Sequence, residues 1–217
     1  MLEYLNRRSD PVSSVPSRFQ KSPISQPSSK SVDQTNKLFV GGTQTRPDSG
    51  YSHDIFSGDH RIGSVSQGNR KDIRNAVESA RKSNAWAKQS SHARAQVLFF
   101  IAENLSDQQS IYVDLLKSVM SESDAEAEVE KAIERVFLYA AWADKLDGRV
   151  HRPPIHGLVT ALHEPLGVIG VVCPDESPLV ALVSLCCSAI ALGNRVVVVP
   201  STVLPTIATA FYKTIEA

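Results

Sequence analysis

Two adjacent carboxylates, Asp175 and Glu176, interrupt an otherwise apolar part of the sequence. The apolar run that precedes them is typical of a buried parallel strand, and the run that follows is typical of a buried helix. Ligands of open α/β sheets bind at such a turn, beyond the carboxyl end of a strand. The pair could act as a general acid and base, but adjacent side chains diverge unless the turn folds them together. We favour the simpler interpretation, a solvated turn at a helix N-terminus, where the helix dipole stabilises negative charge.

The cysteines are a second group with possible chemistry. Cys173, Cys186 and Cys187 all lie in apolar surroundings, and no histidine that could act as their base is near them in the sequence. An odd number of cysteines without a framework spacing indicates reduced thiols in a reducing compartment. We therefore predict that they pack in the interior and attack no substrate.

Three histidines are candidate metal ligands. His151, His156 and His163 are separated by the Pro153-Pro154 pair, so at most two of them share a strand face. Because a structural metal site needs more ligands than that, we predict no metal site.

The elements that position the Asp175-Glu176 turn form one repeating unit. Val168 to Cys173 is predicted to be a strand, and Ser177 and Pro178 have the residue types of a helix N-cap and first helical position. Gly193 has the type of the residue that follows a helix C-terminus, and 195–199 is a second apolar strand. A strand, a crossover helix and a second strand predict parallel pairing. Another amphipathic helix is expected over 205–217.

The preceding sequence predicts helices followed by a hairpin. Asn69 can cap a first helix with Ile73 on its apolar face, and a second is expected from about Ala93. Capping-box patterns at Ser106 and Ser123 predict two more, the first with inward Ile111, Leu115 and Val119. The stripe of the longest helix, which Gly148 is expected to end, is Val129, Ile133, Val136, Ala140 and Ala143. Short strands are expected over 37–42, around the Gly58-Asp59 turn, and over 150–155 and 158–163.

Length and composition limit the possible functions. The 217 residues carry 23 basic and 23 acidic side chains, and this zero net charge argues against a dedicated nucleic-acid binder. No apolar run reaches the ~20 residues of a membrane helix. Residues 1–36, rich in Ser, Pro and Gln, are expected to be a disordered leader or an inter-module linker, with a transit peptide as the alternative. Parallel Val- and Ile-rich strands need neighbours, so we expect the chain to be a piece of a larger module.

Several motifs, in this order and spacing, resemble the aldehyde dehydrogenase superfamily. The stretch "NRKDIRNAVESARKSNAWAKQSSHARAQVLFFIAENL" is similar to the opening helices of that family, and "YAAWADKLDGRV" to its helix-to-hairpin passage. "EPLGVIGVVCP" and "SAIALGNRVVVVPS" resemble its first two nucleotide-domain strands. The closest resemblance is to the second, degenerate module of the two-module family-sixteen enzymes.

The resemblance implies NAD(P)-dependent oxidation of an aldehyde to a carboxylic acid, with NAD or NADP as cofactor. The catalytic cysteine and glutamate of the family correspond to positions beyond 217, so we assign no catalytic residue here. Glu176 stands where the family has an asparagine that holds the oxyanion. Val199 and Thr202 stand where the family has a lysine and a glutamate for the adenosine ribose. The remaining cofactor-binding positions implied by the resemblance are Val172, Cys173, Pro174 and Ser201.

The expected architecture is α/β: a helical N-terminal layer, a hairpin over 148–164 and the start of a Rossmann-like parallel sheet, all within a partial nucleotide-binding domain over 37–217. The first functional hypothesis is a degenerate, non-catalytic module that serves dimerisation or partner binding. The alternatives are a fragment of an active enzyme and an unrelated binding domain. The resemblance further implies homo-oligomers through the hairpin and a cytoplasmic protein, with mitochondria as the alternative; no nucleic acid or membrane partner is expected.

Overall fold

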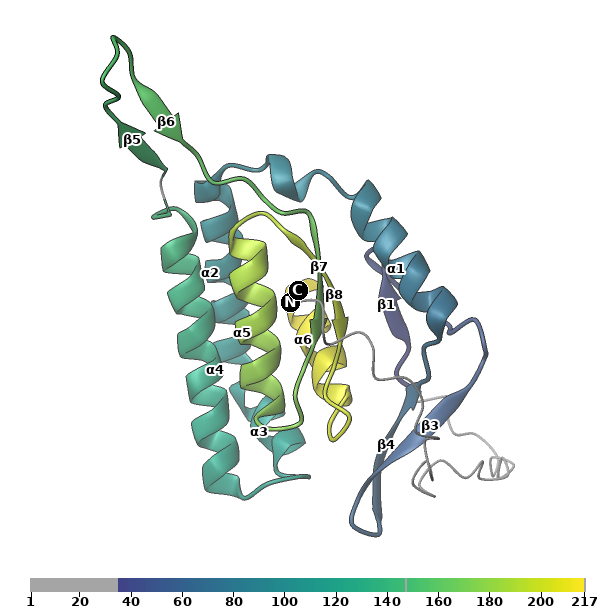
Figure 1. The fold of residues 1–217 in the computed structure, drawn as a ribbon. Helices are drawn as coiled ribbons and strands as arrows, with labels where there is room; N and C mark the ends of the chain where they lie inside the picture. The colour runs from purple at the N-terminus through teal and green to yellow at the C-terminus, as the bar shows by residue number, and fades with distance from the viewer. Residues whose placement is uncertain (1–34, 147, 217) are drawn as a thin grey trace, which may run out of the picture. The chain divides into compact units, whose positions relative to one another are not determined.

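The protein has a mixed α/β fold, which the computed structural model describes over residues 35–146 and 148–216 (Figure 1). Most of the expected leader over 1–36 lies outside these described residues. Asn36 pairs with Val65 through an isolated β-bridge, so the ordered fold already includes this position. No helix in the described ranges is long and apolar enough to cross a membrane.

The predicted strand-helix-strand unit is confirmed. Strands β7 (Val168–Val172) and β8 (Arg195–Val199) pair in parallel, with Val168 opposite Arg195 and Val172 opposite Val199. Helix α5 (Pro178–Ala191) makes the crossover between them. Gly193 has φ of 81°, so it occupies the left-handed conformation expected just after a helix end.

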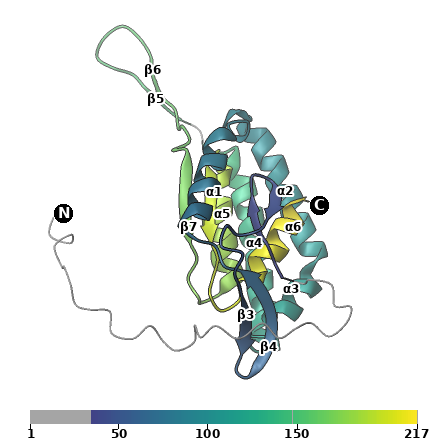
Figure 2. The same ribbon diagram turned by 90° about the vertical axis from the view of Figure 1, so that its right-hand side faces the viewer.

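Helices contact both sides of the β7–β8 sheet. Helices α1 (Arg70–Lys82) and α5 each contact its strands, and Figure 1 shows them on opposite sides; Figure 2 gives the view turned by 90°. Helices α2 (Ser91–Asp107) and α4 (Glu122–Ala143) pack with α5, and α6 (Thr206–Glu216) contacts α2 and α5. The sheet therefore lies within the helical layers that were expected from the sequence.

The hydrophobic core forms where α2, α4 and α5 meet. Fully buried side chains from these helices include Leu98, Ala102, Leu105, Val129, Val136, Ala140, Leu179, Val183 and Cys187. The stripe predicted for the longest helix is confirmed, with its Ile133 only partly buried. By contrast Ile73, predicted to face inward on the first helix, is exposed.

Two helix starts differ from the capping-box prediction. Helix α3 (Gln109–Leu116) has Gln108 at its N-cap and no side-chain cap, and it buries Tyr112 and Leu116 while Ile111 is exposed. Helix α4 begins after Ser121, two residues before the predicted Ser123, because the Ser121 hydroxyl accepts the N–H of Asp124. In a serine-rich segment the pattern fits more than one start, and packing selects among them.

The remaining strands form hairpins. The predicted turns separate β1 (Leu38–Val40) from β2 (Thr43–Thr45), and β3 (Ser52–Ser57) from β4 (His60–Ser66). A short 3-10 helix, η3 (Trp86–Lys88), lies between α1 and α2.

The third hairpin is shorter than predicted. Strands β5 (Arg149–His151) and β6 (Val159–Ala161) have three residues each and extend beyond the ends of α2 and α4 in Figure 1. Helix α4 ends at Ala143, five residues before the predicted Gly148.

Candidate functional site

The carboxyl ends of β7 and β8 bring two turns together, and we call residues 173–177 and 200–205 the strand-end site. Parallel pairing places both ends at the same edge of the sheet, where open α/β folds bind ligands. The N–H of Cys173 donates to the carbonyl of Val199 at 2.9 Å, which continues the pairing into the first turn. The two turns are therefore held in fixed register.

Asp175 bonds the first turn to the second. Its Oδ1 accepts the Ser201 hydroxyl at 2.9 Å and the Thr202 backbone N–H at 2.7 Å. The Thr202 hydroxyl lies 3.0 Å from Oδ1 and 2.9 Å from Oδ2. We call this set of bonds the Asp175 clasp.

The clasp stabilises the ionised form of Asp175. The Ser201 hydroxyl, followed by the backbone N–H and hydroxyl of Thr202, lowers the pKa of the Asp175 carboxyl, because each bond favours the charged state. A carboxylate held in this state accepts hydrogen bonds and does not deliver a proton near neutral pH. Asp175 is therefore unsuited to act as a general acid.

Glu176 is exposed, and its side chain has no hydrogen bond to any residue in 35–146 or 148–216. The two carboxylates are thus not brought together as an acid/base pair. The prediction of a solvated turn holds for Glu176. It does not hold for Asp175, whose carboxylate accepts hydrogen bonds from Ser201 and Thr202 of the second turn.

The residues predicted to contact a cofactor are only partly brought together. Ser201 is buried with its hydroxyl bonded to Asp175, and Cys173 is buried beneath the first turn. Pro174 is exposed at the turn, whereas Val172 is 76% exposed and lies in a groove along β7. Their assignment as cofactor contacts stays a prediction.

The strand-end site does not fit a dinucleotide. At the position where the resemblance implies a lysine, Val199 is 41% exposed and offers no polar group. The hydroxyl and N–H of Thr202 are already bonded to Asp175. The exposed Glu176 adds a negative charge that disfavours a phosphate.

The cysteine thiols are protonated packing groups. Cys173, Cys186 and Cys187 are all buried and unpaired. Burial raises the pKa of Cys173, and burial with the neighbouring Cys173 raises the pKa of Cys186 to about 12. Because the thiolate is the nucleophilic form, these thiols are unreactive at neutral pH.

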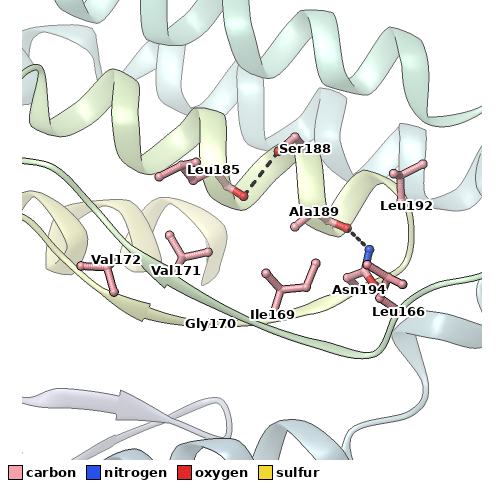
Figure 3. Close-up of a pocket in the computed structure, with 10 residues that line it drawn as sticks. All are labelled: Leu166, Ile169, Gly170, Val171, Val172, Leu185, Ser188, Ala189, Leu192 and Asn194. Atoms are coloured by element: carbon pink, nitrogen blue, oxygen red, sulfur yellow. Dashed lines mark hydrogen bonds between the residues drawn. The ribbon is translucent and has the colours of Figure 1, made fainter. Parts of the chain in front are cut away.

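A groove of about 530 Å³ lies between β7 and α5 (Figure 3). Its polar groups are already bonded within the chain: the Ser188 hydroxyl donates to the Ser184 carbonyl at 2.6 Å, and the Asn194 amide donates to the Ala189 carbonyl at 3.1 Å. The lining from Leu166, Ile169 and Leu185 is apolar. The groove thus has little to orient a polar substrate. Within residues 35–146 and 148–216, no three His, Cys, Asp or Glu side chains are grouped as a metal site.

The sequence analysis missed Glu128, a carboxylate of α4 that lies next to the start of α5, just after residues 173–177 of the strand-end site. Its Oε1 accepts the N–H of Leu179 at 2.8 Å and that of Val180 at 3.3 Å, at the start of α5. Ser177 is the N-cap residue as predicted, but its side chain makes no capping bond. The available signal was an acidic residue at an inward position of the helix, between Ala125 and Val129.

Comparisons with known proteins agree on one family. The sequence model described as the aldehyde dehydrogenase family matches residues 55–217. Retinaldehyde dehydrogenase 3 of Rattus norvegicus is 26% identical over 178 residues, which are 78% of this chain and 35% of that protein. The mitochondrial benzaldehyde dehydrogenase of Antirrhinum majus is 32% identical over 174 residues, 76% of this chain and 32% of that protein.

Solved structures show the same fold. A betaine aldehyde dehydrogenase from Staphylococcus aureus, solved in complex with NAD+, superposes with a TM-score of 0.81 at 21% identity, over 85% of this chain and 38% of that one. An NAD-dependent aldehyde dehydrogenase from Sinorhizobium meliloti superposes with a TM-score of 0.80 at 23% identity. The chain has a partial aldehyde dehydrogenase fold and spans about a third of the length of these curated relatives.

Proposed function

Because this chain belongs to the aldehyde dehydrogenase family, we propose that it forms the first part of a nucleotide-binding domain and that it oxidises no aldehyde by itself. The Asp175 clasp is the observation that carries this proposal. It uses the hydroxyl groups of Ser201 and Thr202 and the Thr202 N–H, so these donors at the strand ends are not free for a ligand.

The chemistry of Glu176 supports the same conclusion. In the family resemblance this position carries an amide that donates to the developing oxyanion. An ionised carboxylate donates no hydrogen bond and repels negative charge. Loss of one oxyanion donor costs about 3 kcal/mol of transition-state stabilisation, and a like charge in its place costs more.

The proposed role is structural, in dimerisation or partner binding. The finer resemblance to the second module of a family-sixteen enzyme belongs to this proposal, since such a module would need neither a nucleophile nor a bound nucleotide. We place the protein in the cytoplasm, with mitochondria as the alternative. Relatives in both compartments match the chain.

A second candidate is the nucleotide-binding part of an active NAD-dependent enzyme. It is favoured by the family match over 55–217 and by the NAD+ complexes of relatives with the same fold. In that case, chain that follows these residues in a longer protein would supply the nucleophile.

The test uses the purified 217-residue chain with several aldehydes and either NAD or NADP. We expect no reduced cofactor by absorbance and no binding heat in calorimetric titration. Turnover above that of a heat-inactivated sample contradicts the non-catalytic role. Micromolar binding of NAD to the unaltered chain contradicts the claim that the clasp excludes a nucleotide, and favours the second candidate.

A further inference from the structure

Helix α5 begins without a local cap. Its N-cap residue Ser177 has φ of 49°, in the left-handed region that is unfavourable for a residue with a Cβ, and its hydroxyl bonds no helical N–H. Pro178 has no N–H. The next free donors, Leu179 and Val180, are both accepted by Oε1 of Glu128, and the N–H of Ala181 returns to the Ser177 carbonyl. Glu128 therefore accepts hydrogen bonds from the two backbone N–H groups at the start of α5 that Ser177 does not cap.

Glu128 is buried, and among the described residues its side chain accepts hydrogen bonds from the start of α5 alone. The residue is 8% exposed, and Ala125, Val129 and Ala132 around it on α4 are fully buried. A carboxylate is costly to bury unless it is hydrogen-bonded, and here two backbone N–H groups and the positive end of the α5 dipole provide the partners. The bonds connect positions 51 and 52 residues apart, so they fix α5 relative to α4.

The other end of α5 has the complementary arrangement. Arg94 of α2 donates from Nε to the Ala191 carbonyl at 3.0 Å, and the Trp86 indole donates to the Ile190 carbonyl at 2.9 Å. A cation thus meets the carbonyl end and an anion meets the N–H end, as the helix dipole favours. Only the N-terminal end is adjacent to the strand-end site.

We propose that Glu128 is a positioning residue: by holding the first turn of α5 from α4, it fixes residues 174–177 in the conformation from which Asp175 reaches Ser201 and Thr202. The left-handed Ser177 fits this role, because such a conformation persists only when surrounding contacts impose it. The inference deepens the proposed function, since it concerns what holds the same site closed.

The first test compares variants at the two ends of α5. Glu128→Leu removes the acceptor, Glu128→Gln keeps an acceptor oxygen, and Arg94→Met removes a cap at the far end. NMR follows the Thr202 amide signal against pH, which reports the titration of the bonded Asp175 carboxyl. We expect the midpoint to move up in Glu128→Leu, toward an ordinary aspartate. In Glu128→Gln the midpoint should lie close to that of the unaltered chain, and in Arg94→Met it should be unchanged. This holds even if Glu128→Leu and Arg94→Met both lower the melting temperature.

An equal upward shift in Arg94→Met would show that any weakening of α5 loosens the clasp, and an unchanged midpoint in Glu128→Leu would show that Glu128 does not position it. Either result overturns the proposal. The readout needs no nucleotide and no aldehyde. NAD binding to the unaltered chain therefore tests the proposed function separately.

A second measurement needs no variant and decides the case if Glu128→Leu fails to fold. Amide hydrogen exchange is measured at Leu179 and Val180 in the unaltered chain. In a helix without a cap, the first backbone N–H groups have no acceptor and exchange their hydrogens at close to the unprotected rate. We expect protection comparable to that of Ala181, whose N–H is bonded within the helix. Exchange of both amides at the unprotected rate would contradict the proposal.

Discussion

Asp175 and Glu176 are neighbours in the sequence with opposite environments. From the sequence, both residues were interpreted together, either as an acid/base pair or as a solvated turn. The structure separates them because Ser201 and Thr202, 26 and 27 residues later, bond Asp175 alone. Which carboxylate meets the second turn depends on the register of β7 against β8, and a single turn sequence carries no information on it.

The clasp should contribute to stability. Asp175→Ala leaves the Ser201 and Thr202 donors without their acceptor, and water can replace only part of the bonding. We expect a loss of about 1 kcal/mol in the free energy of unfolding, below the range for a buried charged acceptor because the site is exposed. Glu176→Ala is the matched control and should change stability by no more than about 0.5 kcal/mol. Urea denaturation measures both, and equal losses would count against the clasp.

The contribution of the Asp175 clasp to the free energy of unfolding should depend on pH. The pKa of Asp175 is lowered in the folded state relative to the ordinary value of 3.8, so the unfolded chain takes up the proton first as the pH falls. The stability difference between the unaltered chain and Asp175→Asn is therefore fully present above about pH 5 and is lost as the pH falls through the folded-state value, below 3.8. Urea titrations at a series of pH values measure it. A difference that grows on acidification would mean that the sign of the shift is wrong.

At the scale of elements, local signals predicted α5 and its strands well but not what holds their ends. The apolar run, Pro178 and Gly193 indicated where the helix begins and ends. Ser177 had the residue type of a cap, yet the cap comes from Glu128, about 50 residues away. Long-range capping leaves only an indirect trace in a sequence, as a charged residue at an inward helical position.

In helix α3, local sequence likewise did not predict which residues are fully buried. Of the predicted residues, Leu115 and Val119 are partly buried against the core and Ile111 is exposed, whereas the fully buried residues are Tyr112 and Leu116. A buried tyrosine hydroxyl needs a hydrogen-bond partner. Thr214 of α6 supplies that partner at 2.6 Å, and burial raises the pKa of Tyr112 to about 12.

The Tyr112–Thr214 pair should be coupled in stability. Thr214→Val leaves the buried Tyr112 hydroxyl unsatisfied, which costs about 1–3 kcal/mol. Tyr112→Phe removes the other partner, and Thr214 keeps its bonds to Gln108 and the Ala210 carbonyl, so this loss should be smaller. The double variant should lose less than the sum of the two, because no unsatisfied hydroxyl remains on Tyr112. Chemical denaturation of the four proteins gives the coupling, and strict additivity would contradict it.

At the scale of the whole molecule, the order of the motifs predicted the partial fold correctly. Helices, hairpin and parallel strands follow one another as expected, since the type of each element follows from local signals, whereas packing decides where α3 and α4 begin. In the described part of the chain β7 is paired on one side only, by β8, and the apolar groove lies beside it. The matched part makes up 35% and 32% of two curated relatives, which therefore have additional residues beyond it.

The β5–β6 hairpin is another surface with exposed apolar side chains. Val150, Ile155, Leu158 and Leu162 are each between 68% and 77% exposed, and within residues 35–146 and 148–216 the two hairpin strands pair only with each other. An isolated two-stranded hairpin is marginally stable in water, and clustered exposed apolar side chains mark an interaction surface. We therefore propose that this hairpin mediates self-association of the protein.

Deletion of residues 149–162 should convert dimers into monomers, as measured by sedimentation equilibrium. The change removes the exposed apolar hairpin and none of the residues that form the core. Leu158→Lys combined with Leu162→Lys should weaken association without shortening the chain, because charged groups are costly to bury in an interface. Phe100→Lys is the matched control, since Phe100 on α2 is also apolar and 64% exposed but lies outside the hairpin. An unchanged mass after the deletion, or dissociation by Phe100→Lys alone, would assign self-association to another surface.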